Sequence, residues 1–241
     1  MNMSFNFIKR LVLFLIGMTI IQFGVALFLK SDIGSDPFTV FNQGLAFAIH
    51  TTPGRANIII LIVLTCLIFI FGRSYINIGT VICVFGVGPV IDFALSVISY
   101  VPIESYNIVV KGLLVVFGCL IVGVGFSILS ATSLGMAPND SVYFIIKDKT
   151  KFQYRWVRIT TDLCYLIAGY FLGGVVGVGT VIAAFLPGPV IQFCLPYGER
   201  FVNLLLANSF EDKFWKNYKY TFIFNNQSYK NVLFDIVKRM R

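Results

Sequence analysis

Two carboxylates within long apolar stretches are the first candidates for chemistry. Asp92 lies in the stretch 78–98, and Asp162 lies in 159–172. If these stretches cross a membrane, each charge costs about 2.5 kcal/mol or more, so such residues normally face the interior of a helix bundle and handle ions or protons. We predict that Asp92 binds substrate, the alternative being one interhelical hydrogen bond in a packed core. For Asp162, the alternative is an ion pair with Arg158, one turn earlier, near the cytoplasmic interface.

Glycine and proline interrupt two of these stretches near their middle. The predicted substrate-binding positions are Gly86, Gly88 and Pro89 in the first stretch, and Gly188, Pro189 and Gln192 in the second. Proline removes a backbone hydrogen bond and clashes with the preceding turn. Broken helices often line the solute site of transporters. An equally simple interpretation is a packing kink at which glycine allows close helix approach.

Two short apolar segments, 37–49 and 139–146, begin with residues that favour a helix N-terminus. Asp36 precedes Pro37, and Asp140 follows Pro138. A helix N-terminus within a protein presents free N–H groups and partial positive charge, which can hold an anion. Because Asp36 and Asp140 can satisfy those donors themselves, ordinary capping is the favoured interpretation, and substrate binding is the alternative.

The remaining reactive residue types form no recognisable site. All five cysteines lie in apolar stretches without a paired-cysteine motif, and the lone histidine, His50, has no metal-ligating neighbour in the sequence. The sequence also lacks nucleophile-elbow, zinc-protease and phosphate-loop motifs. We therefore expect no metal, no cofactor and no enzymatic activity.

An internal repeat organises these candidates. The segments 79–93 (GTVICVFGVGPVIDF) and 179–193 (GTVIAAFLPGPVIQF) share ten of fifteen residues at an offset of 100. Upstream, IGSDP at 33–37 matches LGMAP at 134–138 at an offset of 101, as do Gly17 and Gly24 with Gly118 and Gly125. The chain is therefore predicted to contain two copies of one unit.

Six stretches approach the length of about 20 apolar residues that a membrane span requires. They are 11–29, 56–71, 78–98, 108–131, 159–172 and 179–195. We predict an all-α polytopic membrane protein with six transmembrane helices and two short re-entrant or interfacial helices. Since three spans per unit is an odd number, the two repeats are inverted. If the short helices also crossed, four-span units would instead be parallel.

Composition and charge agree with a membrane location. The chain is 57% hydrophobic with a mean hydropathy of +0.84, and only 12% of its residues are charged, about half the usual share. The net charge of +8 would suggest nucleic acid in a soluble protein, but all except three of the 19 Lys and Arg (Lys30, Arg55 and Lys111) fall on one side of the six-span arrangement. Basic residues accumulate on the cytoplasmic side. We expect a plasma-membrane protein with both termini cytoplasmic and no nucleic-acid partner.

This arrangement predicts four regions. Residues 1–10 form a cytoplasmic N-terminus, 11–105 the first membrane repeat, 106–205 the second, and 206–241 a basic, aromatic cytoplasmic tail. The tail suits either a segment on the membrane surface or a loose extension.

Three motifs carry a resemblance to a known family. IGSDPFTVFNQGLA, TPGRANIIILIV and GRSYINIGTVICVFGVGPVIDF are similar to the YczE-type bacterial membrane proteins, with a more distant likeness to the YitT group. The resemblance spans roughly residues 11–205 and leaves the tail outside. It implies a bacterial plasma-membrane location and no defined activity.

The leading functional hypothesis is a small permease or transporter of an ion or small solute. The alternative is a membrane-embedded regulatory or accessory protein that acts through partners. The first predicts a polar site at mid-membrane, and the second predicts a dry core with a conspicuous exposed surface.

Overall fold

The computed structural model describes residues 2–206, which form helices joined by short loops and contain no strand. In chain order the helices are α1 (Asn2–Ser31), α2 (Pro37–Ala48), α3 (Pro53–Phe71), α4 (Ile78–Ile98), α5 (Ile108–Ala131), α6 (Pro138–Thr150), α7 (Tyr154–Phe171), α8 (Val178–Phe185) and α9 (Pro187–Leu206). Two single 3-10 turns, η1 (Arg73–Tyr75) and η2 (Ile103–Ser105), lie in the loops. The predicted all-α class is confirmed. From residue 207 on, the predicted tail lies outside the described residues.

Five helical segments in the described range are long and apolar enough to span a bilayer. They are 6–31, Pro53–Phe71, Ile78–Ile98, Ile108–Ala131 and 178–206, the last combining α8 and α9. The predicted span at 159–172 corresponds to α7, which is not among the five. Its 18 residues include the charged Arg155, Arg158 and Asp162, which lower its hydropathy. The sequence prediction of six spans is therefore confirmed only for five.

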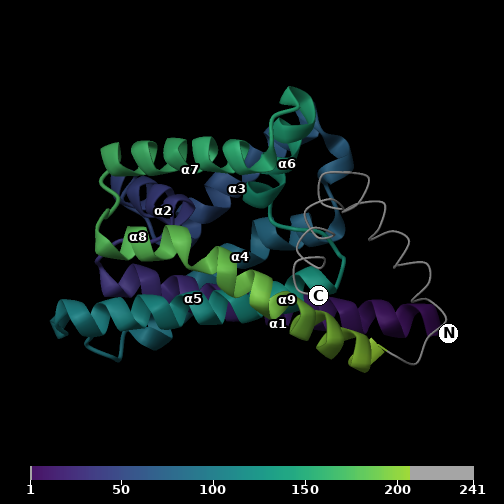
Figure 1. The fold of residues 1–241 in the computed structure, drawn as a ribbon, viewed down its shortest axis with the longest axis horizontal. Helices are drawn as coiled ribbons and strands as arrows, with labels where there is room; N and C mark the ends of the chain where they lie inside the picture. The colour runs from purple at the N-terminus through teal and green to yellow at the C-terminus, as the bar shows by residue number, and fades with distance from the viewer. Residues whose placement is uncertain (1, 207–241) are drawn as a thin grey trace, which may run out of the picture.

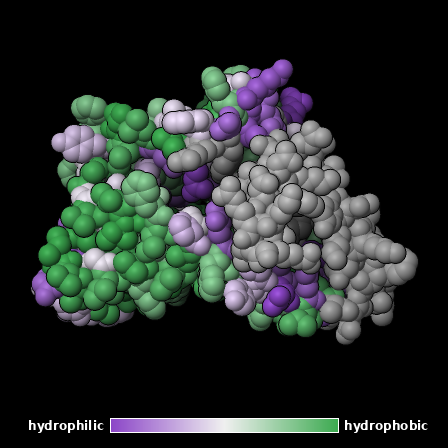
Figure 2. Space-filling model, in the orientation of Figure 1, coloured by the Kyte–Doolittle hydropathy of each residue, from purple (hydrophilic) through white to green (hydrophobic). Residues whose placement is uncertain are grey.

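Apolar side chains cover much of the outer surface. Phe171, Phe185 and Ile70 are each more than 70% exposed. Figure 2 shows hydrophobic residues over most of the left part of the visible face, with hydrophilic residues gathered at the upper right, near the end of α6 in Figure 1. Because water disfavours so large a continuous apolar surface, lipid is its natural solvent. The chain is a multi-pass membrane protein.

The helices α1 and α5 cross closely and run antiparallel along the long axis of the molecule (Figure 1). A Cβ built on Gly17 would lie 2.9 Å from the Gly125 carbonyl oxygen, and one on Gly24 would lie 2.8 Å from the Gly118 carbonyl oxygen. These backbones are therefore too close for any side chain at the four glycines. Small residues allow this approach between membrane helices.

The two short helices lie toward opposite ends of the molecule in Figure 1, α2 at the left and α6 at the right. α2 packs on α7, where a Cβ on Gly44 would lie 2.4 Å from the carbonyl oxygen of Gly169. α6 packs on α3, where the Ile145 side chain is the nearest neighbour of Gly72. Each short helix thus packs against a helix of the other half of the chain.

The loops before the short helices make matching contacts across the two halves. The Gly79 N–H donates to the Leu134 carbonyl at 2.9 Å, and the Gly179 N–H donates to the Ile33 carbonyl at 2.8 Å. Glycine is needed at the next position of each loop, because Gly34 and Gly135 have φ values of +102° and +124°.

The two glycine-proline motifs, at which helix interruptions were predicted, differ in whether the helix is interrupted. α4 continues through Gly86, Gly88 and Pro89 as one helix from Ile78 to Ile98, so the prediction of an interrupted helix is wrong there. In the second half the helix does divide, at Leu186, between α8 and α9. The repeat explains the difference: Val87 stands where the second copy has Pro187, so α4 has one proline at this place and the second copy has two, each lacking an N–H.

Candidate functional site

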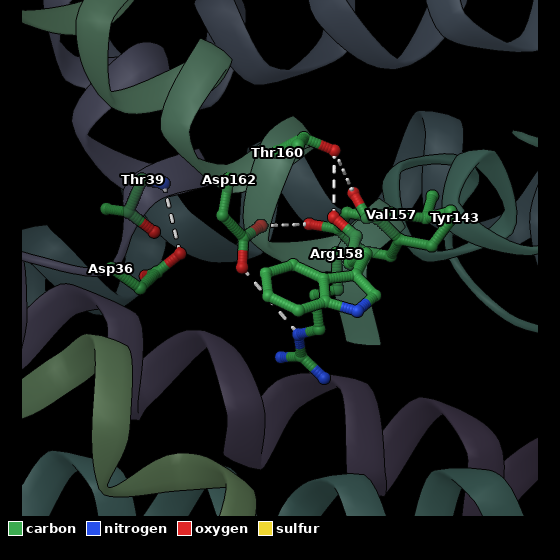
Figure 3. Close-up of polar contacts among 8 residues, drawn as sticks. Asp36, Thr39, Tyr143, Val157, Arg158, Thr160 and Asp162 are labelled. Atoms are coloured by element: carbon green, nitrogen blue, oxygen red, sulfur yellow. Dashed lines mark hydrogen bonds and ion pairs between the residues drawn. The ribbon is translucent and has the colours of Figure 1, made fainter. Parts of the chain in front are cut away.

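A polar cluster lies at the middle of α7, centred on Asp162. The Tyr143 hydroxyl of α6 donates to Asp162 Oδ1 at 2.6 Å. Arg158, one turn earlier on α7, places Nε 3.7 Å from Asp162 Oδ2. Figure 3 shows Asp162 between Tyr143 on one side and Asp36 on the other. The predicted pairing of Asp162 with Arg158 is confirmed, but it lies midway along α7 rather than at the helix end.

The N-terminus of α2 reaches this cluster through Asp36. Asp36 is the N-cap, and its Oδ1 accepts a hydrogen bond from the Thr39 N–H at 3.2 Å. Pro37 occupies the first turn, where no N–H is required. The predicted capping role of Asp36 is confirmed.

The N-terminus of α6 approaches the same cluster without a side-chain cap. Its N-cap is Ala137, which has no side chain to accept a hydrogen bond, and Asp140 lies in the first turn. The capping alternative predicted for Asp140 is therefore wrong, because its own N–H donates to the Ala137 carbonyl and its side chain caps nothing.

Charges from three helices interact within this cluster. Asp140 is attracted by Arg158 and repelled by both Asp36 and Asp162. Three carboxylates with one guanidinium leave an excess of negative charge when all are ionised. Such a site disfavours an anion and favours a cation or a proton. An isolated helix N-terminus has the opposite preference and favours an anion.

Aromatic rings form one wall of the cluster. Tyr165, one turn after Asp162, lies 5.4 Å from the Phe38 ring and 5.6 Å from the Phe41 ring. The hydroxyl of Thr160 bonds within α7, to the carbonyls of Trp156 and Val157 (Figure 3). The two ring contacts of Tyr165 join α2 to α7 beside the carboxylates.

Asp92, the first sequence candidate, lies elsewhere. Its Oδ2 accepts a hydrogen bond from the Thr52 hydroxyl at 2.6 Å, and its Oδ1 accepts one from the Gly54 N–H at 2.9 Å. Asp92 therefore caps the start of α3, where the loop enters the membrane region. Near it, Gly88 packs against Gly54, and a Cβ on Gly88 would lie 2.4 Å from the Gly54 carbonyl oxygen.

The other predicted glycine, proline and glutamine positions also lie outside the cluster. Gly86 packs against Met18, whose side chain would lie 3.0 Å from a Cβ built on Gly86, as a packing interpretation expects. Pro89, Pro189 and Gln192 are exposed on the outer face, and a Cβ on Gly188 would meet nothing within 4 Å. Of the nine predicted substrate-binding residues, the structure brings only Asp36 and Asp140 together.

Sequence reasoning missed Tyr143 and treated Arg158 only as an ion-pair partner. The repeat contained a signal, because at an offset of 101 these two residues correspond to the polar Asn42 and Asn57. Polar residues at matching interior positions of both copies indicate a shared interior face.

Two contacts outside the membrane region tie loops together at opposite ends of the molecule. Lys30 Nζ donates to Glu104 at 2.6 Å, and this hydrogen bond lowers the pKa of the exposed Glu104 carboxyl. The Tyr75 hydroxyl donates to Asp148, and burial followed by this hydrogen bond raises the pKa of Tyr75. Within residues 2–206, no group of three or more His, Cys, Asp or Glu side chains has an arrangement that could hold a metal ion.

Comparison with known proteins places the chain in a family. A family of unknown function, DUF6198, matches residues 8–196. The chain belongs to this family. Relatives of the chain include an uncharacterised membrane protein, YczE, of Bacillus subtilis, which is 28% identical over 206 residues covering 85% of this chain and 94% of the relative. The resemblance to YczE-type proteins is confirmed, and the relation to the YitT group stays a prediction.

Two further relatives carry no assigned activity. An uncharacterised protein of Haemophilus influenzae is 26% identical over 78% of this chain and 84% of its own length. The uncharacterised protein YyaS of Bacillus subtilis is 27% identical over 77% of this chain and 92% of its own length. No solved structure matches the chain.

Proposed function

We propose that the protein is a small permease of the bacterial plasma membrane, built from two inverted three-span repeats. The six spans are α1, α3, α4, α5, α7 and the α8–α9 pair. Lipid surrounds them, and neither an enzymatic reaction nor a nucleic-acid partner is part of the proposal.

Contacts between the halves support the inverted repeat. Gly17 packs against Gly125, and Gly24 packs against Gly118. The repeat offset of 101 relates Gly17 to Gly118 and Gly24 to Gly125, so it converts each contact into the other. The loop hydrogen bonds from Gly79 and Gly179 also exchange, with an offset of 100 for the glycines and 101 for the carbonyl residues Ile33 and Leu134. A two-fold axis produces such reciprocal contacts, and the antiparallel crossing of α1 and α5 is what two first spans entering from opposite sides would give.

The orientation follows from basic residues. Lys147, Lys149 and Lys151 lie at the end of α6, and the Tyr75–Asp148 hydrogen bond joins this end to η1, beside Arg73. The positive-inside rule makes this end cytoplasmic and, with six spans, leaves both termini on the same side.

The arrangement of the two short helices is the single observation that carries the transport proposal. Their N-termini, entering from opposite ends, meet around Asp162, which lies at the middle of α7. Secondary transporters bind solutes near mid-membrane, where discontinuous helices from two repeats meet. Ionisable residues at this depth are costly and are retained for ion or proton movement.

Flux into vesicles reconstituted with the purified protein tests this proposal. The solutes are labelled sodium, rubidium, amino acids and sugars, with a pH-sensitive dye to report protons. Asp162→Asn should lower the flux by about tenfold or more, because losing roughly 1.4 kcal/mol of charge-assisted interaction already changes an equilibrium constant tenfold.

Asp92→Asn is the matched control, since it makes the same chemical change at the α3 cap, and asparagine also caps helices. It should keep most of the flux. If both variants elute as native protein in gel filtration, an equal loss of flux in the two would show that the transport site is not centred on Asp162. No flux of any solute would contradict transport and favour an accessory protein acting through partners.

A further inference from the structure

Asp36 differs from the other two carboxylates of the central cluster in its lack of a cationic neighbour. Arg158 attracts both Asp140 and Asp162. Within residues 2–206, Asp36 accepts hydrogen bonds from Thr39 and is repelled by Asp140 and Asp162, and no Lys or Arg attracts it. A carboxylate that is shielded from water needs a positive partner when ionised, and no described residue supplies one to Asp36.

Three neutral oxygens in the same half of the chain are buried without a partner. Ser35 is 2% exposed, Asn42 1% and Asn57 3%. Ser35 Oγ and the Oδ1 atoms of Asn42 and Asn57 accept no hydrogen bond in the described part of the chain. Each such oxygen atom costs about 1–3 kcal/mol if no group bonds to it. Three of them together point to a bound ligand that these side-chain oxygens contact.

The position of each oxygen relates it to Asp36. Ser35 is the residue directly before Asp36. Asn42 lies one turn after Thr39 on the same face of α2, and Thr39 is the residue whose N–H binds Asp36. Both residues therefore lie within two helical turns of the Asp36 carboxylate along the chain.

The repeat relates Asn57 to Asn42 as it relates Arg158 to Tyr143. At the offset of 101, Asn42 and Asn57 correspond to Tyr143 and Arg158, and the Arg158 guanidinium lies 5.8 Å from the Tyr143 ring. Leu61 corresponds to Asp162 and is 1% exposed. The first half thus has neutral oxygens and a leucine where the second half has a tyrosine, a guanidinium and a carboxylate.

We propose that Asp36, together with the oxygens of Ser35, Asn42 and Asn57, binds a monovalent cation, either an alkali metal ion or an ammonium ion. One carboxylate with several neutral oxygens matches a single positive charge. Hard cations take oxygen ligands, and oxygens near broken or short helices coordinate coupling ions in transporters. This inference rests on the proposed permease function and assigns its central site to a cation.

Thermal unfolding of the full chain in detergent tests the cation site without requiring transport. Choline chloride is replaced at constant ionic strength by sodium, potassium, lithium or ammonium chloride. A cation that binds only the folded protein raises the Tm in a saturable way. A rise with an alkali ion identifies a metal cation, and a rise with ammonium alone identifies an ammonium-type substrate.

Asp36→Asn should require an about tenfold higher salt concentration for the half-maximal rise, while still capping α2. Asp32→Asn is the matched control: Asp32 is exposed in the same loop, and asparagine tolerates its φ of +53°. It should respond as the native protein does. The same half-maximal concentration in Asp36→Asn would overturn the site.

Ser35→Ala keeps the test decisive if Asp36→Asn fails to fold. Removal of an unpartnered buried hydroxyl should raise the Tm in choline and weaken the rise caused by the cation. A Tm that is the same in all five salts would overturn the proposal, as would a Tm that responds to pH alone. Flux with choline as the sole added cation would overturn cation binding but leave the transport proposal standing. A cation-dependent Tm without any flux would overturn transport but leave the cation site standing.

Discussion

At the residue scale, two partners hold the half-buried carboxylate of Asp162. The Tyr143 hydroxyl and the Arg158 guanidinium both approach its carboxylate. A carboxylate removed from water without such partners would cost several kcal/mol. The pair therefore allows an acidic residue to persist at the middle of α7.

Tyr143→Phe should lower the free energy of unfolding by about 1–3 kcal/mol, because a hydrogen bond to a charged group is lost and Asp162 is left partly unsatisfied. Denaturant titration of the purified protein in detergent measures the change. Tyr170→Phe is the control, since Tyr170 is 63% exposed and its ring lies 5.9 Å from the neighbouring Phe171 ring. An equal, small effect of the two substitutions would contradict the stabilising role of Tyr143.

At the element scale, the crossing of α1 and α5 holds the two halves together. Their backbones approach at Gly17, Gly24, Gly118 and Gly125, two from each helix. Since no hydrophobic force drives apolar helices together in lipid, close packing of this kind supplies the attraction.

Gly125→Val should destabilise the fold by about 1–3 kcal/mol or more, because its Cβ would lie 2.8 Å from backbone atoms of Gly17 and Ile21, which cannot move aside. Gly112→Val, in the same helix, should be nearly neutral, as nothing lies within 4 Å of its Cβ. Both substitutions change helix propensity alike, so their difference isolates packing. Similar denaturation midpoints for the two variants would argue against a close crossing.

At the scale of the whole molecule, the two ends are chemically different. One end joins η1 to α6 through Tyr75 and Asp148 and carries Lys149 over the Phe71 ring. The other end joins α1 to η2 through Lys30 and Glu104. The basic residues gathered at the first end are what the positive-inside rule requires of a cytoplasmic face.

Labelling of single cysteines tests this orientation. In a background lacking the five native cysteines, Ser105→Cys should react with an impermeant maleimide in intact cells. Ser74→Cys and Thr150→Cys should react only after permeabilisation. All three positions are exposed in loops or at a helix end. If Ser74→Cys and Thr150→Cys reacted from opposite sides, the inverted six-span arrangement would be wrong.

Much of the membrane architecture follows from the sequence alone. Bilayer thickness imposes a minimum length on apolar stretches, so span positions can be read from composition. The prolines and Asp36 mark the starts of the short helices, because capping depends on residues that are neighbours in the chain. The weakest span prediction was α7, where Arg155, Arg158 and Asp162 dilute the apolar signal.

Only the tertiary structure decided which polar residues meet. Asp92 and Asp162 look alike in the sequence, yet Asp92 caps α3 and Asp162 lies at the centre. The difference arises because α6 and α2 converge on α7 from the two halves of the chain. Apolar periodicity gives the depth of a residue in its own helix, whereas its neighbours depend on close packing between segments about a hundred residues apart.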